Sequence, residues 1–307
     1  MADGARRVPA QGNRFTVLGT LGGPTPHPSR GQPAYLLTVD GVHSLVDMGD
    51  GAAHRLAAVG VLCRQIERAF VSHLHGDHFG GLFAIMALRL QTNSPKPLMI
   101  YGAPGTARMV EGLLDALEPA MEAGYGMPGA PRFKRDQIAT VEELRDGDVR
   151  DFPGFRLTVC RNNHYSFEPG APEYERYQSL SMRFDLVDRA IVYTGDTGRS
   201  EAVERLAAGC DLLVGEVIDI DDTLAGVLRQ APDLPEKAVA FIRRHLTDHH
   251  LAPDDLGRLA TAARAKHLLV AHIATGSPDR IDPAALTAEI GRSFAGRITV
   301  ANDYDVF

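Results

Sequence analysis

The chain has 307 residues, of which 44% are apolar and 23% are charged. This composition is typical of a folded globular protein and excludes a predominantly disordered chain. The net charge of −7 argues against nucleic-acid binding, because a phosphate backbone is usually met by a basic surface.

Apolar runs rich in β-branched residues predict strands, and amphipathic stretches between them predict helices. In the first half, strands are expected at 14–19, 34–39, 43–47 and 68–72, and helices at 52–59, 79–90 and 104–117. In the second half, strands are expected at 155–160, 179–186, 190–194, 211–217, 267–272 and 297–300, and helices at 200–208, 235–244, 254–265 and 283–293. Strand clusters punctuated by helices predict an α/β protein, an αββα sandwich of two mixed β-sheets with helices outside.

The chain 1–307 is expected to be a single domain with two pseudo-equivalent halves, about 14–150 and 151–307. Three segments interrupt the pattern and are expected to be irregular, as lids or variable decoration: 119–137, 165–178 and 218–235. The overlapping segment 218–245 is compatible with a homodimer interface.

The cysteines indicate a reducing compartment. Cys63, Cys160 and Cys210 lie far apart and form no C-x-x-C pair, so they are interpreted as reduced core residues.

The N-terminal segment has no apolar stretch typical of a signal sequence, and no apolar run is long enough to span a bilayer. A cytoplasmic protein without a membrane partner is therefore expected.

The segment SHLHGDHFGG at 72–81 concentrates three histidines and an aspartate directly after a predicted buried strand. In an extended segment His73 and His75 point to the same side, and the following turn brings Asp77 and His78 round to face them. Imidazole nitrogens and carboxylate oxygens are ligands that suit zinc. The spacing H-x-H-x-D-H therefore predicts two adjacent metal ions rather than a histidine-rich surface loop.

Further candidate ligands follow other predicted strands. His164, Asp196 and His272 each stand at the carboxyl end of an apolar run. Taken singly, they could be a loop residue, a helix cap and a core histidine. Together with the segment 73–78, they indicate a complete set of metal ligands.

These motifs resemble those of the metallo-β-lactamase superfamily, and more narrowly the branch that contains ribonuclease Z and the zinc-dependent arylsulfatases. The resemblance rests on VLGTLGGPTPHPSRG, SLVDMGDG, VSHLHGDHFGGL, IYGAPGT, NNHY, VYTGDTG and HHLAPDDLGRLATAARAKHLLVAHI. It implies the fold of that superfamily and two zinc ions per chain, with manganese or iron as substitutes. The implied ligands are His73, His75 and His164 for the first ion, Asp77, His78 and His272 for the second, and Asp196 as the bridge. The resemblance also implies that Asp47 supports the ligands from behind, with Asp50 as a weaker alternative.

Two zinc ions would share a water and lower its pKa towards about 7, which provides a bridging hydroxide to attack an ester. A histidine near the metals is expected to donate a proton to the leaving group. His250 is favoured because it directly precedes the predicted helix that leads to His272, while His245 and His249 are the alternatives. Asp77 is grouped with His250 among the catalytic residues.

The expected function is hydrolysis of a small ester, with a phosphodiester or sulfate ester favoured and a lactone or thioester as the alternative. A tRNA 3′-processing endonuclease is a further alternative. It is not the leading one, because those enzymes carry a long arm and the segment between His164 and Asp196 leaves little room for it. Nucleic acid is therefore not expected as a partner. An iron dioxygenase using only the first metal site and a metal-free scaffold are the remaining alternatives.

The stretch GTLGGPTPHPSRG at 19–31 could line the mouth of the site. Arg30 is the candidate substrate-binding residue, because its guanidinium group can bind an anion bidentately. His27 is a weaker candidate, and turn chemistry explains the glycines and prolines equally well.

Overall fold

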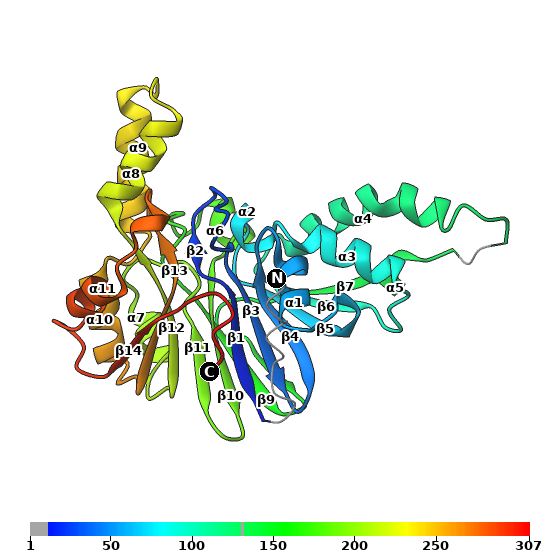
Figure 1. Ribbon diagram of the computed structural model, residues 1–307, viewed down its shortest axis with the longest axis horizontal. Coiled ribbons are helices and arrows are strands. Elements are labelled where there is room, and N and C mark those ends of the chain that lie inside the picture. The colour runs from blue at the N-terminus through cyan, green and yellow to red at the C-terminus, as the bar shows by residue number, and fades with distance from the viewer. Residues whose placement is uncertain (1–11, 130–131) are drawn as a thin grey trace, which may run out of the picture.

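The computed structural model describes residues 12–129 and 132–307. They form two β-sheets that face each other, with helices on the outer faces (Figure 1). The expected αββα sandwich of two mixed sheets is confirmed. The segment 1–11, which carries most of the N-terminal stretch judged to lack a signal sequence, lies outside the described residues.

Each sheet combines an antiparallel part with a parallel part. The first sheet has the strand order β1 (Arg14–Gly19), β3 (Ala34–Val39), β4 (Val42–Met48), β5 (Ile66–Val71), β6 (Leu98–Gly102) and β7 (Ala139–Glu143). The second has the order β14 (Arg297–Val300), β13 (His267–Ala274), β12 (Leu212–Ile218), β11 (Ala190–Tyr193), β10 (Leu180–Leu186), β9 (Phe155–Arg161) and β8 (Val149–Phe152), and β2 (Leu21–Gly22) pairs with β13. Strands β4 to β7 and β11 to β14 run parallel.

The helices follow the strands in chain order. Those in the first half are α1 (Ala52–Ala58), α2 (Gly76–Phe79), α3 (Leu82–Gln91), α4 (Thr106–Ala123) and α5 (Arg135–Ile138). Those in the second half are α6 (Pro172–Arg176), α7 (Glu201–Leu206), α8 (Ile220–Gln230), α9 (Glu236–Asp248), α10 (Pro253–Ala262) and α11 (Pro283–Ile290). Two 3₁₀ turns lie at Cys63–Gln65 and Pro278–Arg280.

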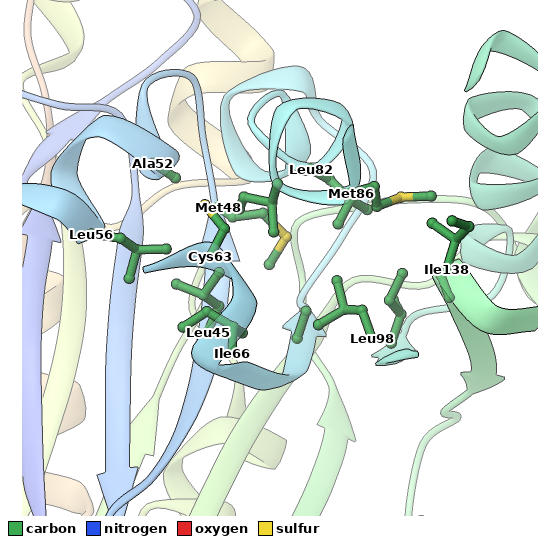
Figure 2. Close-up of a cluster of buried hydrophobic side chains, with 14 of the residues drawn as sticks. Leu45, Met48, Ala52, Leu56, Cys63, Ile66, Leu82, Met86, Leu98 and Ile138 are labelled. Atoms are coloured by element: carbon green, nitrogen blue, oxygen red, sulfur yellow. The ribbon is translucent and has the colours of Figure 1, made fainter. Parts of the chain in front are cut away.

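Apolar layers hold the sandwich together. Strand β3 is buried on both faces, because Tyr35 and Leu37 pack between the sheets while Leu36 packs towards the helices. Figure 2 shows part of the layer under the helices, where Leu56 of α1 and Met86 of α3 lie over the first sheet. A third layer lies between the second sheet and α7, α10 and α11. This double-sided burial fixes the strands and hence the positions of the loops at their ends.

The expectation of an irregular segment at 218–235 is wrong, because α8 occupies 220–230. The Asp219 carboxylate caps this helix by accepting the backbone N–H of Asp222. Helix α4 likewise continues to Ala123, into the stretch 119–137. Strands β6, β7 and β8 were not predicted; their runs are short, so periodicity gives a weak signal.

Helices α8 and α9 form a helical hairpin, residues 220–248, that projects from the body of the molecule, and α4 extends away on the other side (Figure 1). Only the base of the hairpin is well buried, through Leu224 and Leu246. A homodimer through this region stays a prediction. Among the described residues, no helix combines the length and apolar character needed to cross a membrane.

Candidate metal centre

The candidate ligands gather where strands from both sheets end. His73 and His75 follow β5, and helix α2 begins directly after His75. His164 follows β9, Asp196 follows β11, and His272 lies near the end of β13. Segments that are far apart in the sequence therefore converge on one edge of the sandwich.

The first group of ligands contains His73, His75 and His164. The His164 Nε2 atom lies 2.9 Å from His75 Nδ1, and the ligand atoms of all three residues lie within 4.8 Å of one another. A tetrahedral zinc ion with bonds of about 2.0–2.1 Å separates its nitrogen ligands by roughly 3.4 Å. The three imidazoles are thus close enough to bind one ion.

The second group contains Asp77, His78 and His272. The Asp77 Oδ2 atom lies 3.6 Å from His78 Nε2 and 3.8 Å from His272 Nε2. Asp196 lies between the groups, with Oδ2 3.9 Å from His73 Nε2 and 3.3 Å from His78 Nε2, and with Oδ1 3.1 Å from His272 Nε2. The structure thus brings together all seven ligands that the resemblance implied; metal binding by each stays a prediction.

Several buried polar atoms in the centre form no hydrogen bond of acceptable geometry within the described part of the chain. They include the Nε2 atoms of His73, His78 and His272, and Asp196 Oδ1. Buried polar atoms without a hydrogen bond are rare and costly in folded proteins. Cations bound between these atoms would satisfy them, so the residues fit a metal centre.

The negative charge of the buried carboxylates also fits a centre that binds metal cations. Asp47, Asp77, Asp196 and Glu216 are all buried, and two divalent cations would carry the opposite charge. Burial by itself would lower the pKa of His272, but the Asp196 carboxylate outweighs it and raises that pKa to about 10. The carboxylates thus require positive charge beside them, which protons supply when metal ions do not.

Hydrogen bonds to the second ring nitrogen orient three of the imidazoles. The Nδ1 atom of His78 lies 2.7 Å from Asp47 Oδ2, and that of His73 lies 3.0 Å from Ser72 Oγ. The Nδ1 atom of His164 lies 3.0 Å from the backbone carbonyl oxygen of His249, just beyond α9. Each contact engages Nδ1 and leaves Nε2 for the centre, as metal-ligating histidines require.

Asp47 lies behind the ligands, where the resemblance placed it. Besides His78, its carboxylate accepts the Ser72 backbone N–H at 2.8 Å, the Ser72 hydroxyl at 2.6 Å and the Tyr193 hydroxyl at 2.7 Å. Asp47 and His272 have φ values of 49° and 56°. Such backbone is costly for residues other than glycine and often occurs at functional sites. Asp50 is exposed, and its backbone N–H donates to Gln32.

His250 is buried beside the ligands, with its ring 4.9 Å from that of His164. Its Nδ1 atom lies 2.7 Å from Glu216 Oε2. Burial by itself would lower the pKa of His250, but the Glu216 carboxylate outweighs burial and raises it. Sequence reasoning missed Glu216; the available signal was a lone acidic residue inside the apolar strand LLVGEVI.

The alternatives to His250 lie at the end of α9. His245 and His249 face each other with their Nδ1 atoms 2.8 Å apart. Burial, reinforced by His250, lowers the pKa of His245 to about 4. His245 therefore stands beside the centre as a neutral imidazole.

The stretch 19–31 contacts the centre through its backbone. The Gly23 N–H donates to Asp77 Oδ2 at 3.1 Å, and a Cβ atom on Gly22 would lie 2.6 Å from the His272 ring. Arg30 is half-buried and donates to the Thr20 hydroxyl at 2.8 Å, while His27 lies 3.4 Å from Asp279. Substrate binding by Arg30 stays a prediction.

Comparison with known proteins gives relatives of similar length. The chain is 31% identical to ribonuclease Z of Mycobacterium avium over 94% of its length and 95% of that protein. It is 30% identical to ribonuclease Z of Mycobacterium marinum, covering 94% and 96%. Residues 14–216 match the family described as anti-Pycsar protein Apyc1.

Solved structures share the fold. The metallo-β-lactamase fold protein YhfI of Bacillus subtilis superimposes with a TM-score of 0.69 at 19% identity, covering 96% of this chain and 98% of YhfI. The short form of human tRNase Z gives a TM-score of 0.64 at 22% identity, covering 96% and 98%. This agreement confirms the metallo-β-lactamase fold.

The expectation of a small ester substrate is wrong, and so is the exclusion of nucleic acid, because the relatives are ribonucleases Z. Two arguments failed. The relatives align over about 95% of their own length, so the space between His164 and Asp196 does not distinguish this chain from them. Net charge is a sum over the whole molecule and does not show where positive side chains gather.

The ligand geometry, the near full-length similarity to ribonucleases Z and the shared fold agree with one another. The chain belongs to the ribonuclease Z branch of the metallo-β-lactamase superfamily, with the Apyc1 family match covering residues 14–216, and is a metal-dependent hydrolase.

Proposed function

We propose that the protein is a binuclear metal-dependent ribonuclease. It would cleave the phosphodiester bond that joins the 3′ extension of a precursor tRNA to the rest of the molecule. The observation that supports this most is the convergence of seven ligands, within a chain that aligns with ribonucleases Z over nearly its whole length. The buried carboxylates and the imidazole nitrogens without hydrogen bonds would be stabilised by bound cations. A metal-free scaffold protein would have no reason to bury them together.

Two zinc ions per chain are the proposed cofactors, with manganese or iron as substitutes. His73, His75 and His164 would hold one ion, Asp77, His78 and His272 the other, and Asp196 both. When bound, the ions would lower the pKa of water towards about 7 and polarise the phosphoryl oxygens. The second set of ligands argues against an iron dioxygenase that uses one ion.

His250 is the proposed proton donor to the leaving oxygen. The Glu216 carboxylate, which also accepts the Thr197 N–H at 2.6 Å, holds Nδ1 of His250. That contact fixes the orientation of the ring and favours its protonated form, as a general acid needs. Asp77 would contribute as a ligand of the second ion, together with His78 and His272.

We further propose that the chain is one domain and works in the cytoplasm. With the exception of β2, the strands before residue 145 form the first sheet and the later ones form the second, so each half supplies part of the ligand set. Cys63, Cys160 and Cys210 are free and buried, which suits a reducing compartment.

The test is cleavage of a precursor tRNA with a 3′ extension by the purified protein with zinc bound. We expect release of the 3′ extension as one fragment, its loss when the metal is removed by a chelator, and its return with added zinc. The Asp50→Ala variant, which removes an exposed carboxylate near the centre, serves as the control. An intact precursor at full metal occupancy would refute the proposal.

A second candidate follows from the match of 14–216 to the family described as anti-Pycsar protein Apyc1. If the chain acts against a Pycsar system, its expression in cells that carry one should abolish the output of that system. The Asp196→Ala variant should have no such effect. Precursor tRNA cleavage without any effect on Pycsar would leave only the ribonuclease function.

A further inference from the structure

A row of aromatic rings leads away from the first metal group. Tyr165 directly follows His164, and its ring lies 5.6 Å from that of His75. The Phe167 ring lies 5.8 Å from Tyr165 and 6.4 Å from Tyr177. Phe167 is 40% exposed, so part of this ring is free to contact a ligand.

The row ends at a groove of about 420 Å³ that Tyr177 helps to line. The groove adjoins the metal loop through Leu74, which stands between His73 and His75. A Cβ atom on Gly105, in the groove wall, would lie 2.7 Å from Leu74 Cδ1 and 3.3 Å from the Tyr177 ring. The backbone N–H of Leu74 in turn donates to the Tyr165 hydroxyl at 3.2 Å.

Three exposed arginines line the groove: Arg108, Arg145 and Arg176. Arg145 donates to the Glu175 backbone oxygen at 3.0 Å and lies 3.9 Å from its carboxylate. Within residues 12–129 and 132–307, neither Arg108 nor Arg176 forms an ion pair, so both guanidinium groups are available to an anion.

The acidic residues of the groove are already engaged. Glu143 accepts the backbone N–H groups of Gly105 and Ala107 at 2.8 and 3.1 Å, at the start of α4. Glu175 is the partner of Arg145. The three arginines that line the groove outnumber its two glutamates, so the groove is locally positive although the chain as a whole is acidic.

We propose that this groove binds the single-stranded part of the RNA substrate, with phosphates on Arg108 and Arg176 and a base stacked on Phe167. A positive groove combined with aromatic rings is the arrangement by which proteins hold single strands without reading their sequence. The proposal rests on the proposed ribonuclease function and adds to it the surface that holds the substrate strand.

The test measures binding of a fluorescein-labelled oligoadenylate with phosphorothioate linkages, which resist hydrolysis, to the zinc-loaded protein by fluorescence anisotropy. Arg108→Ala and Arg176→Ala should each weaken binding and reduce the slope of log K against log salt by about 0.7, the value for one lost phosphate contact on a single strand. Arg292→Ala is the matched control, because Arg292 is an exposed arginine after α11. It should change neither quantity.

Phe167→Ala should weaken binding by about fivefold to a hundredfold, the range for loss of one stacked base. Its salt slope should stay unchanged, because stacking releases no counterions. Phe167→Tyr should restore the affinity. Zinc content and melting temperature, measured for every variant, identify any variant that fails to fold.

The outcomes separate the two proposals. If the wild type binds the oligoadenylate and cleaves precursor tRNA, but the arginine and Phe167 variants bind like Arg292→Ala, the groove is not the RNA path and the ribonuclease function stands. If the wild type cleaves precursor tRNA without binding the oligoadenylate, the groove proposal is refuted alone. If the wild type neither binds nor cleaves RNA, both proposals fail.

Discussion

The metal centre and the outer helices α4, α8 and α9 differ in what holds their side chains. In the centre, buried ligands are fixed by hydrogen bonds to partners such as Asp47 and Glu216. Helix α4 buries one apolar stripe, whereas α8 and α9 are well buried only at their base, and the Phe241 side chain on α9 is 73% exposed. A single substitution should therefore have a large effect on metal binding or activity in the centre, and only a small effect on stability in the outer helices.

The largest effect is expected for Asp196→Ala, because Asp196 approaches both ligand groups. The variant should lose at least one metal ion per chain. Its rate of RNA cleavage should fall by more than about 100-fold. Loss of a residue that only orients a metal ligand lowers activity by at most about that factor. Elemental analysis and cleavage rates check this, and retention of two ions would refute the bridging assignment.

The next effect is expected for His250→Ala. Loss of a general acid should lower kcat by about 10²-fold to 10⁴-fold, while the metal content stays at the wild-type level. His245→Ala is the comparison, since His245 is the neighbouring candidate, and His54→Ala controls for loss of an exposed histidine on α1. If His245→Ala alone lowers kcat, the role of proton donor moves to His245.

A smaller effect is expected for Gly22→Ala. The added Cβ atom would lie 2.6 Å from the His272 ring, so the ring must move away from its position beside Asp77 and Asp196. We expect zinc affinity to fall by about 10-fold to 100-fold, as when a metal ligand is misoriented. Competition with a chelator measures it; an unchanged affinity would show that β2 can shift at no cost.

The smallest effect, with the opposite sign, is expected for Gly112→Ala on α4. Gly112 is exposed inside the helix, and a Cβ atom there meets no neighbour within 4 Å. Alanine should stabilise the protein by roughly 0.5–1 kcal/mol, because it reduces the entropy lost on folding. Thermal unfolding with metal content as the control checks this; destabilisation would mean that the face of α4 at Gly112 is not open.

The sequence by itself determined the two-sheet fold and the seven candidate ligands. Strand periodicity depends on which faces are buried, and the spacing H-x-H-x-D-H brings four of the ligands together within a single loop, so both can be recognised locally. His164, Asp196 and His272 were recognised because each follows a predicted strand and because the motifs resemble those of the superfamily. Helix α8 was missed; its N-terminal cap, in which the Asp219 carboxylate accepts the Asp222 N–H, is seen only in the structure.

Only the tertiary structure shows that Glu216 contacts His250 and that the His249 carbonyl oxygen contacts His164. It also shows that the aromatic row with Phe167 leads from the metal loop towards the groove that Arg108 lines. These contacts join residues distant in sequence, and their positions depend on how strand ends from two sheets meet. Net charge misjudged the substrate because it does not record where positive side chains gather. Segment length misjudged it because the ribonuclease Z relatives align over about 95% of their own length.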